Sequence, residues 1–415
     1  MGWSARGTCP VMTDLALLLK RHGYDAIQVD REARHGGTTY QSRLMGRRAV
    51  VLGGARGAET FYDEAFVERR RAIPAPLAWL LFGRGAVHGL DDDVHRDRKL
   101  MFLEALSPER LGTLRERVRA DLTGARDTWT GRDVSLHDEL VLVYGGAVLD
   151  WAGIDLPAEQ RSLWSRRLAA IVDGFGFAGA AYARACRERQ RADRWAAGLV
   201  REVRDGRRIA PRGSALSEVA GNADLDARTA GVELLNILRP TVAVAWLGTF
   251  AGAALRDAPD WRHRLATEHS DLEAFAFAQE VRRTTPFAPA LAGRARSYGE
   301  VDGTRIRPGD RLVLDVLGIH HDPEIWADPK AFRPDRFLTH RPGAFELVPQ
   351  GGGHPSGHRC PGESIALGLL VDTIRVLAPT ECDVAGSTEP DRSRIPTLPD
   401  GGLVLTRVRV PAVRA

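Results

Sequence analysis

The amino-acid sequence predicts a mainly α-helical protein with a small β-sheet region. From Asp92 to about Asp271, apolar residues recur almost throughout at the spacing of helices that bury one face. Short runs typical of strands, bounded by glycine turns, occur before and after this helical region. The chain has 415 residues, of which 44% are hydrophobic, and no Pro/Ser-rich linker divides it. We therefore expect one domain that covers residues 1–415.

The N-terminal part of the chain is predicted to form two strands and a helix. Strands are expected over residues 38–44 and 48–52, joined by a turn at Gly46. A glycine-rich run at residues 53–57 then leads into a helix, but it lacks the Gly-x-Gly-x-x-Gly spacing of dinucleotide-binding turns. Further along, the apolar spacing predicts helices over residues 111–122, 136–151 and 180–207.

A long apolar helix is expected at residues 226–255, with a length of roughly 45 Å. Glu233, Asn236 and Arg239 interrupt its apolar surface, which disfavours a membrane span. Pro240 in its middle removes one backbone hydrogen bond and should kink it. The sequence therefore predicts a long, kinked helix that does not cross a membrane.

Short strands are expected after a helix that begins near Asp271 and ends near Arg283. Asp302-Gly303 is typical of a hairpin turn, and Gly401-Gly402 precedes a last apolar run. The predicted strands cover residues 297–301, 304–306, 311–315 and 403–410.

Charge and cysteine content limit the class of protein. The 58 basic and 54 acidic residues give a net charge of +4, which argues against an obligate nucleic-acid binder. The four cysteines show no paired spacing, as in proteins of a reducing cytoplasm. The first residues lack a charged segment followed by a long apolar run, and the apolar patch at residues 15–19 is short. We expect a cytoplasmic protein with no signal peptide and no membrane anchor.

The most informative segment is the loop at residues 351–362, which is rich in glycine and contains Cys360. Glycines let a backbone pass close to a flat ligand. A cysteine just before a helix feels the positive end of the helix dipole, which favours its thiolate. A single shielded thiolate is one way in which proteins hold haem iron. A free core cysteine is the alternative, and zinc is disfavoured because no second cysteine lies nearby.

Two further segments give this loop a context. Glu280 and Arg283 are three positions apart, so they share a helix face and can pair, either on the surface or in the core. Residues 332–337 read Phe-Arg-Pro-Asp-Arg-Phe, and Arg336 could complete a buried Glu-Arg-Arg cluster. The three segments, in this order, resemble the cytochrome P-450 superfamily. The resemblance implies the cytochrome P-450 fold, haem b (iron protoporphyrin IX) as cofactor and Cys360 as its iron ligand.

Arg239-Pro240 narrows the resemblance. The pair stands in the long helix where most members carry proton-delivering residues, and the cysteine loop is longer than usual. Both features are similar to the bacterial fatty-acid peroxygenase branch, which includes fatty-acid α- and β-hydroxylases and an olefin-forming decarboxylase. The similarity covers residues 40–405. It implies hydrogen peroxide as cosubstrate, long-chain fatty acids as substrates and no required redox partner.

The resemblance also assigns residues to the haem propionates. His358 lies two residues before Cys360, and its alternative is a surface loop histidine. His95 and Lys99 are four positions apart on one predicted helix, so both cations could face the propionates or solvent. Arg71, with Arg69, could add to this site, or the arginine run could be solvated.

Arg239 and His88 are the expected substrate-side residues. An arginine in an apolar helix is costly unless paired, and the alternative partner is Glu233. In the resembling branch this arginine binds the fatty-acid carboxylate, which then acts as acid-base catalyst beside Pro240. At the position of His88, the hydroxylases of that branch have glutamine and the decarboxylase has histidine. The resemblance therefore places His88 near the haem and the carboxylate end of the substrate, and the alternative is a residue that only packs in the core. A monooxygenase with external redox partners and a non-catalytic haem sensor are the competing hypotheses for the whole chain.

Overall fold

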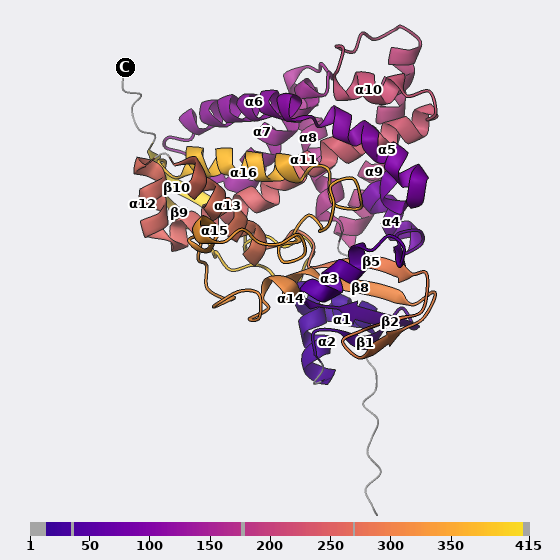
Figure 1. The fold of residues 1–415 in the computed structure, drawn as a ribbon. Helices are drawn as coiled ribbons and strands as arrows, with labels where there is room; N and C mark the ends of the chain where they lie inside the picture. The colour runs from indigo at the N-terminus through magenta and orange to yellow at the C-terminus, as the bar shows by residue number, and fades with distance from the viewer. Residues whose placement is uncertain (1–13, 35–36, 176–178, 269, 410–415) are drawn as a thin grey trace, which may run out of the picture.

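The computed structural model describes residues 14–34, 37–175, 179–268 and 270–409 (Figure 1). A large group of helices lies above a smaller region in which a sheet is flanked by the first two helices. The mainly helical fold with small sheets confirms the predicted fold class. The expectation about the extreme N-terminus falls on residues 1–13, which lie outside the described residues, whereas the apolar patch after them forms α1 with Leu15 and Leu18 in the core.

The helical region is built around α11 (Ala227–Asp257), which packs against α7, α8, α9, α13 and α16. Asp226 caps its start by accepting a hydrogen bond from the Thr229 N–H. The helix continues through Pro240 without interruption. Its length and composition alone would allow a membrane span, but 94% of its most apolar stretch is buried inside the protein. It is the core helix of this fold.

The other helices of this region surround α11. Most bury a row of apolar residues in one continuous core. They are α5 (Asp92–Ala105), α6 (Pro108–Asp127), α7 (Leu136–Trp151), α8 (Ala158–Asp173), α9 (Ala180–Arg204), α10 (Ala215–Gly221), α12 (Pro259–Thr267), α13 (Asp271–Thr284), α15 (Arg336–Thr339) and α16 (Glu363–Leu377).

The main sheet has the strand order β1-β2-β8-β5-β3. Strands β1 and β2 are antiparallel with Tyr40 opposite Val51, and β2 runs parallel to β8. Its strands are β1 (Tyr40–Leu44), β2 (Arg47–Leu52), β3 (Val67–Glu68), β5 (Ala290–Ala295) and β8 (Arg311–Asp315). The remaining strands are β4 (Val134–Ser135), β9 (Glu381–Ala385) and β10 (Val404–Arg409) in one sheet, and the hairpin β6 (Gly299–Val301) and β7 (Thr304–Ile306).

Short helices connect the sheet to the helical region. The sheet and α3 form a second core around Leu52, Phe61 and Leu314. The segment between α4 and α5 contains only the 3₁₀ turn η2 and passes over α11. The short helices are α1 (Leu15–His22), η1 (Gly23–Asp25), α2 (Ala26–Arg34), α3 (Gly54–Tyr62), α4 (Ala75–Phe82), η2 (Val87–Gly89) and α14 (Val316–His320).

Candidate active site

The loop that leads into α16 carries Cys360. Gly351 and Gly353 have φ values of 95° and 78°, a region that glycine enters without strain. A Cβ atom on Gly351 would lie 2.8 Å from the Tyr62 hydroxyl, so the loop packs closely against the end of α3. The Cys360 N–H donates to the Gln350 carbonyl at 2.9 Å and closes the loop.

A buried ion-pair network anchors this loop to α13. Arg282 pairs with Glu363 at 2.6 Å, and its Nε donates to the side chain of Gln350 at 2.8 Å. Arg359 pairs with the other oxygen of Glu363 at 2.6 Å. Burial favours the neutral carboxyl, but the two guanidinium groups outweigh it and hold the pKa of Glu363 below its ordinary value. The residues beside the thiol are thus fixed in position.

The Cys360 thiol is accessible although protein surrounds it. Its side chain is exposed, yet burial raises the pKa of the thiol against the opposing effects of the Gly362 N–H, Lys99 and Arg282. A metal ion bound to the sulfur would favour the thiolate.

Lys99 of α5 binds the cysteine loop directly. Its Nζ donates to the Gly357 carbonyl at 2.8 Å and also to the carbonyl of Arg359. Burial lowers the pKa of Lys99 to about 8. Two of the three ammonium protons therefore fix the loop to α5, a role that the sequence alone did not indicate.

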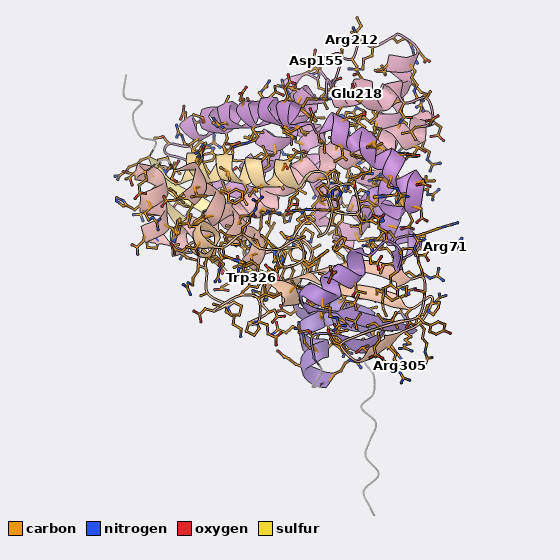
Figure 2. The ribbon with its side chains drawn as sticks, in the orientation of Figure 1. Arg71, Asp155, Arg212, Glu218, Arg305 and Trp326 are labelled. Atoms are coloured by element: carbon orange, nitrogen blue, oxygen red, sulfur yellow. The ribbon has the colours of Figure 1, made fainter. Side chains whose placement is uncertain are left out.

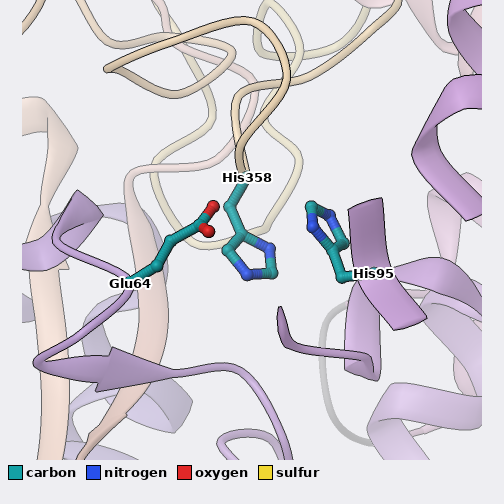
Figure 3. Close-up of side chains that lie close together, drawn as sticks. All are labelled: Glu64, His95 and His358. Carbon is teal, nitrogen blue, oxygen red and sulfur yellow. The ribbon is translucent and has the colours of Figure 1, made fainter. Parts of the chain in front are cut away.

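His95 and His358 lie together at the edge of the site, with Glu64 beside them (Figure 3). The two imidazole rings stack with centroids 3.9 Å apart. His358 Nε2 is 3.5 Å from Asp91. Burial, followed by the nearby His358 and Lys99, lowers the pKa of His95 to about 3. This shift favours the neutral form of His95 in the empty site, and the expectation that His95 and Lys99 face the propionates as two cations stays a prediction.

Ligand atoms of Glu64, His95 and His358 all lie within 4.8 Å of one another. Such spacing could hold a metal ion. Two of the three residues, His95 and His358, are those that the family resemblance assigned to the haem propionates. Among the described residues, His95 Nδ1 has no hydrogen-bond partner although it is buried. One nitrogen of the cluster, His95 Nδ1, is therefore free to bind an added group.

Arg71 does not join this cluster. Its side chain is exposed and extends away from the protein at the edge of the molecule (Figure 2). Arg71 has a φ of 57°, which turns the chain at this point. Arg69 lies over the Phe61 ring at 4.0 Å, and its buried Nη1 lacks a partner within the described part of the chain. Arg69 is thus the inward-facing arginine of the run.

Arg239 lies on α11 and is 5% exposed. Its guanidinium carbon is 5.4 Å from the centroid of the Phe175 ring. No carboxylate of the described residues lies within ion-pair distance of it, and its buried Nε has no partner among them. Burial, followed by repulsion from Arg189, lowers the pKa of Arg239 to about 9, while the Cys360 thiolate opposes this shift. The alternative pairing with Glu233 is wrong, because Glu233 pairs with Arg98.

His88 lies in η2 and is stacked on the Phe82 ring, with centroids 4.1 Å apart. Burial, followed by the positive charge of Arg239, lowers the pKa of His88 to about 3, so the imidazole is neutral. Its Nδ1 is buried and has no partner in the described residues. The sequence did not indicate Phe82 as a neighbour of His88. The two residues are six positions apart in a segment without regular structure, so no periodic pattern relates them.

Glu280, Arg283 and Arg336 form the buried cluster that the sequence offered as one of two alternatives. Glu280 and Arg283 are both fully buried and pair at 2.7 Å. Arg336 lies 3.2 Å from Glu280, which also accepts the Arg333 N–H at 2.7 Å. The surface alternative for Glu280 and Arg283 is therefore excluded.

Beside this cluster, both ring nitrogens of His320 are engaged. Nδ1 lies 3.1 Å from the Arg283 carbonyl, and Nε2 accepts the Val348 N–H at 3.0 Å. Only a neutral ring, protonated at Nδ1, satisfies both contacts. Burial, followed by the charge of Arg283, lowers the pKa of His320 well below its ordinary value.

Comparison with known proteins assigns the family. The sequence profile of the family "Cytochrome P450" matches residues 275–370. Curated relatives include the dimethylnonatriene synthase of Arabidopsis thaliana, 37% identical over 112 residues, which are 25% of this chain and 21% of that protein. The putative cytochrome P450 137 of Mycobacterium tuberculosis is 34% identical over 122 residues, 29% of this chain and 25% of that protein. The chain thus aligns with about a fifth to a quarter of these relatives.

Solved structures match over nearly the whole chain. Cytochrome P450SP alpha (CYP152B1) in complex with (R)-ibuprophen is 36% identical, with a TM-score of 0.91, and the match covers 96% of this chain and 99% of that one. Ligand-free cytochrome P450 OleT is 32% identical, with a TM-score of 0.91, covering 97% and 98%. The chain belongs to the cytochrome P450 family of haem-thiolate oxidoreductases. Within it, the similar structures are P450SP alpha and OleT.

Membership in this family implies haem, and the residues present fit that group. Cys360 would supply the thiolate ligand. The unpartnered nitrogens of Arg69 and His95 are donors of the kind that carboxylates accept. Arg239 and His88 lie close enough to these residues to be affected by their charges. The structure therefore brings together every predicted site residue except Arg71.

Proposed function

We propose that this chain is a hydrogen-peroxide-dependent peroxygenase that oxidises long-chain fatty acids at the α or β carbon, with decarboxylation to terminal alkenes as a second outcome. The observation that carries the proposal is Arg239, a buried guanidinium without a carboxylate partner in the described residues. Burying such a charge without a partner is costly, and an anion that completes the pair would remove that cost. A variant of the similar OleT has been solved with arachidonic acid, which is a fatty acid.

In this proposal Arg239 binds the substrate carboxylate with two parallel hydrogen bonds. Because its pKa of about 9 lies above neutrality, the guanidinium stays charged in the empty site. The carboxylate then lies next to Pro240, which offers neither a hydroxyl nor a backbone N–H. The chain therefore has no proton donor of its own at this position of α11, and the bound carboxylate would hold and transfer the proton.

Bound haem supplies the iron at which the O–O bond of peroxide is cleaved. Cys360 would hold the haem through its thiolate, and His358, His95 and Arg69 would bind its propionates. His88 would present a neutral ring nitrogen near the carboxylate end of the substrate. Since peroxide supplies both oxygen and oxidising equivalents, no redox partner would be required. We further propose that residues 1–415 form a single cytoplasmic domain.

The test is product analysis by gas chromatography after incubation of the haem-loaded protein with a long-chain fatty acid and peroxide, without a reductase. Hydroxy acids or alkenes support the proposal. Product formed only with ferredoxin and a reductase would indicate a monooxygenase instead. A shift of the ferric Soret band by fatty acid, with no product under either condition, would indicate a sensor.

Arg239→Ala tests the mechanism. Removing a positioned acid-base group costs about 10²–10⁴-fold in rate, so fatty-acid turnover should collapse while haem is retained. Acetate with a non-carboxylate substrate should activate the wild type and activate the variant poorly. Arg262→Ala is the matched control. It removes a half-buried arginine of α12 that donates to the carbonyls of Ala378 and Thr380. Normal turnover by Arg239→Ala would refute substrate-assisted catalysis.

A further inference from the structure

The segment between α4 and α5 carries His88 without regular structure on either side of η2. Its first end is held at Phe82, whose carbonyl accepts a hydrogen bond from buried Arg189 at 3.3 Å. Arg189 is itself paired with Asp193 at 2.9 Å. A carbonyl at the end of a helix attracts a cation, so this contact fixes the end of α4. The second end needs another anchor.

Glu233 of α11 provides that anchor. Its side chain is fully buried, and one oxygen, Oε1, accepts the N–H of Val87 at 2.9 Å and the Nη1 of Arg98 at 2.7 Å. The other oxygen accepts the Asn236 amide at 2.9 Å. Val87 is the residue directly before His88. A hydrogen bond from a backbone N–H to a carboxylate is stronger than one to a neutral acceptor.

Arg98 of α5 holds the same segment from the opposite side. It is 15% exposed, and its Nη1 also reaches the Gly85 carbonyl at 3.4 Å. One carboxylate and one guanidinium therefore clamp residues 85–87 between α11 and α5. Burial raises the pKa of Glu233, whereas Asn236, Arg98 and the Val87 N–H oppose that shift.

The place of Glu233 on α11 connects the clamp to the site. Residues seven positions apart on an α-helix lie on the same face, roughly 10 Å apart along the axis. Glu233 thus shares a face with Pro240, and Asn236 lies one turn before Arg239. The position of Val87, and through it of His88, relative to Arg239 is consequently set by Glu233 on α11 together with Arg98 on α5.

We propose that Glu233 is a positioning residue that holds His88 over the substrate carboxylate and thereby sets the partition between products. This inference rests on the proposed function. Glu233 does not touch the reacting atoms. It acts through the Val87 N–H, and a displaced His88 would no longer meet the carboxylate end of the substrate, while Arg239 would still bind it.

The test compares Glu233→Ala with Glu233→Gln in the haem-loaded enzyme. The amide oxygen of glutamine can still accept hydrogen bonds from Val87 and Arg98. The glutamine also gains an N–H group. If the Asn236 amide flips, its Oδ1, which lacks a partner in the described residues, can accept that N–H. Glu233→Gln should therefore keep the product ratio of the wild type. In Glu233→Ala, kcat should fall by about 10²-fold, as for a catalytic geometry misplaced by 1 Å, with little change in KM and a changed product ratio.

A second measurement does not depend on turnover. Amide hydrogen exchange at residues 85–89 should become about tenfold faster in Glu233→Ala, as expected for the loss of one charge-assisted hydrogen bond. Asp372→Asn is the control, because Asp372 is an equally buried carboxylate on α16 that pairs with Arg115 and Arg119. That variant should lose stability without a change in exchange at residues 85–89 or in product ratio.

The outcomes separate the two proposals. No product from the wild type with peroxide would overturn the proposed function. The positioning role alone would be overturned if the wild type forms product and Glu233→Ala shows the same product ratio and the same amide exchange at residues 85–89 as the wild type. If Glu233→Ala does not take up haem, Arg98→Gln loosens the same segment from the side of α5, and the same two measurements decide.

Discussion

Replacing Glu280 by alanine should destabilise the protein more than any surface substitution. Glu280 accepts hydrogen bonds from Arg283 through both oxygens, at 2.7 and 2.8 Å, and from the Arg333 N–H at 2.7 Å. Arg336 Nε adds a longer contact of 3.3 Å. Without the carboxylate, the fully buried guanidinium of Arg283 keeps only the carbonyls of neighbouring residues, such as those of His320 and Pro329.

The magnitude follows from the burial of both partners. Removing one member of a buried ion pair typically costs about 3–5 kcal/mol, because the other charge is left uncompensated. Whole proteins have a net stability of only about 5–15 kcal/mol. We therefore expect Glu280→Ala to be insoluble or to lack haem, and Glu280→Gln, which keeps acceptors but loses the charge, to be intermediate.

The assay is urea unfolding of the soluble fractions, followed by circular dichroism, together with haem content per polypeptide. Arg333→Ala is the control, because it leaves the Arg333 backbone N–H in place and removes only a side chain that pairs with exposed Asp328. An unfolding free energy of Glu280→Ala within about 1 kcal/mol of the wild type, as for an exposed pair, would refute this account of the cluster.

Two further predictions concern the thiol and a buried histidine. Cys360→Ala should abolish the ferrous carbon-monoxide band of thiolate ligation, whereas Cys186→Ala and Cys382→Ala should keep it; a normal band in Cys360→Ala would contradict the ligand assignment. His320 has its pKa lowered by burial, so its neutral ring contributes stability that is fully present above the unfolded value and is lost as pH falls below about 6.5. The unfolding free energy should fall by up to about 1.4 kcal/mol per pH unit for this proton, and His320→Gln should show a shallower slope in urea titrations; equal slopes would contradict the assignment of a neutral ring.

The helices were predictable because their apolar spacing is long and regular. The start of α11 was placed at 226, and the helix begins at Ala227, where the Asp226 cap fixes it. Strand β5 was missed. Its residues are mostly small and include Gly293, so no alternation of large apolar side chains marks them. Pairing with β8 forms this strand, and such a contact between distant segments leaves no local pattern.

The sequence could indicate site residues that lie in recognisable motifs, but not residues whose role depends on their three-dimensional surroundings. Cys360, Arg239 and His88 were proposed from the resemblance of their segments to the family, and their roles stay predictions. The choice between Arg69 and Arg71 depends on a backbone turn inside a run of identical residues. The neutrality of His95 depends on burial beside His358, which belongs to a segment more than 250 positions away. The sequence indicated Glu233 only as a break in an apolar helix and as an alternative partner of Arg239, because its actual partners Val87 and Arg98 come from two other elements.

The unpaired Arg239 also links the binding of an anion in the site to the stability of the folded protein. A buried charge without a partner raises the free energy of the folded state, so the empty protein keeps its guanidinium ready at the expense of its own stability. An anion that completes the pair binds only the folded chain, and such binding raises the unfolding free energy in proportion to the logarithm of ligand concentration. On the proposed function a fatty acid is that anion, so the resistance of the purified protein to unfolding would rise with fatty-acid concentration.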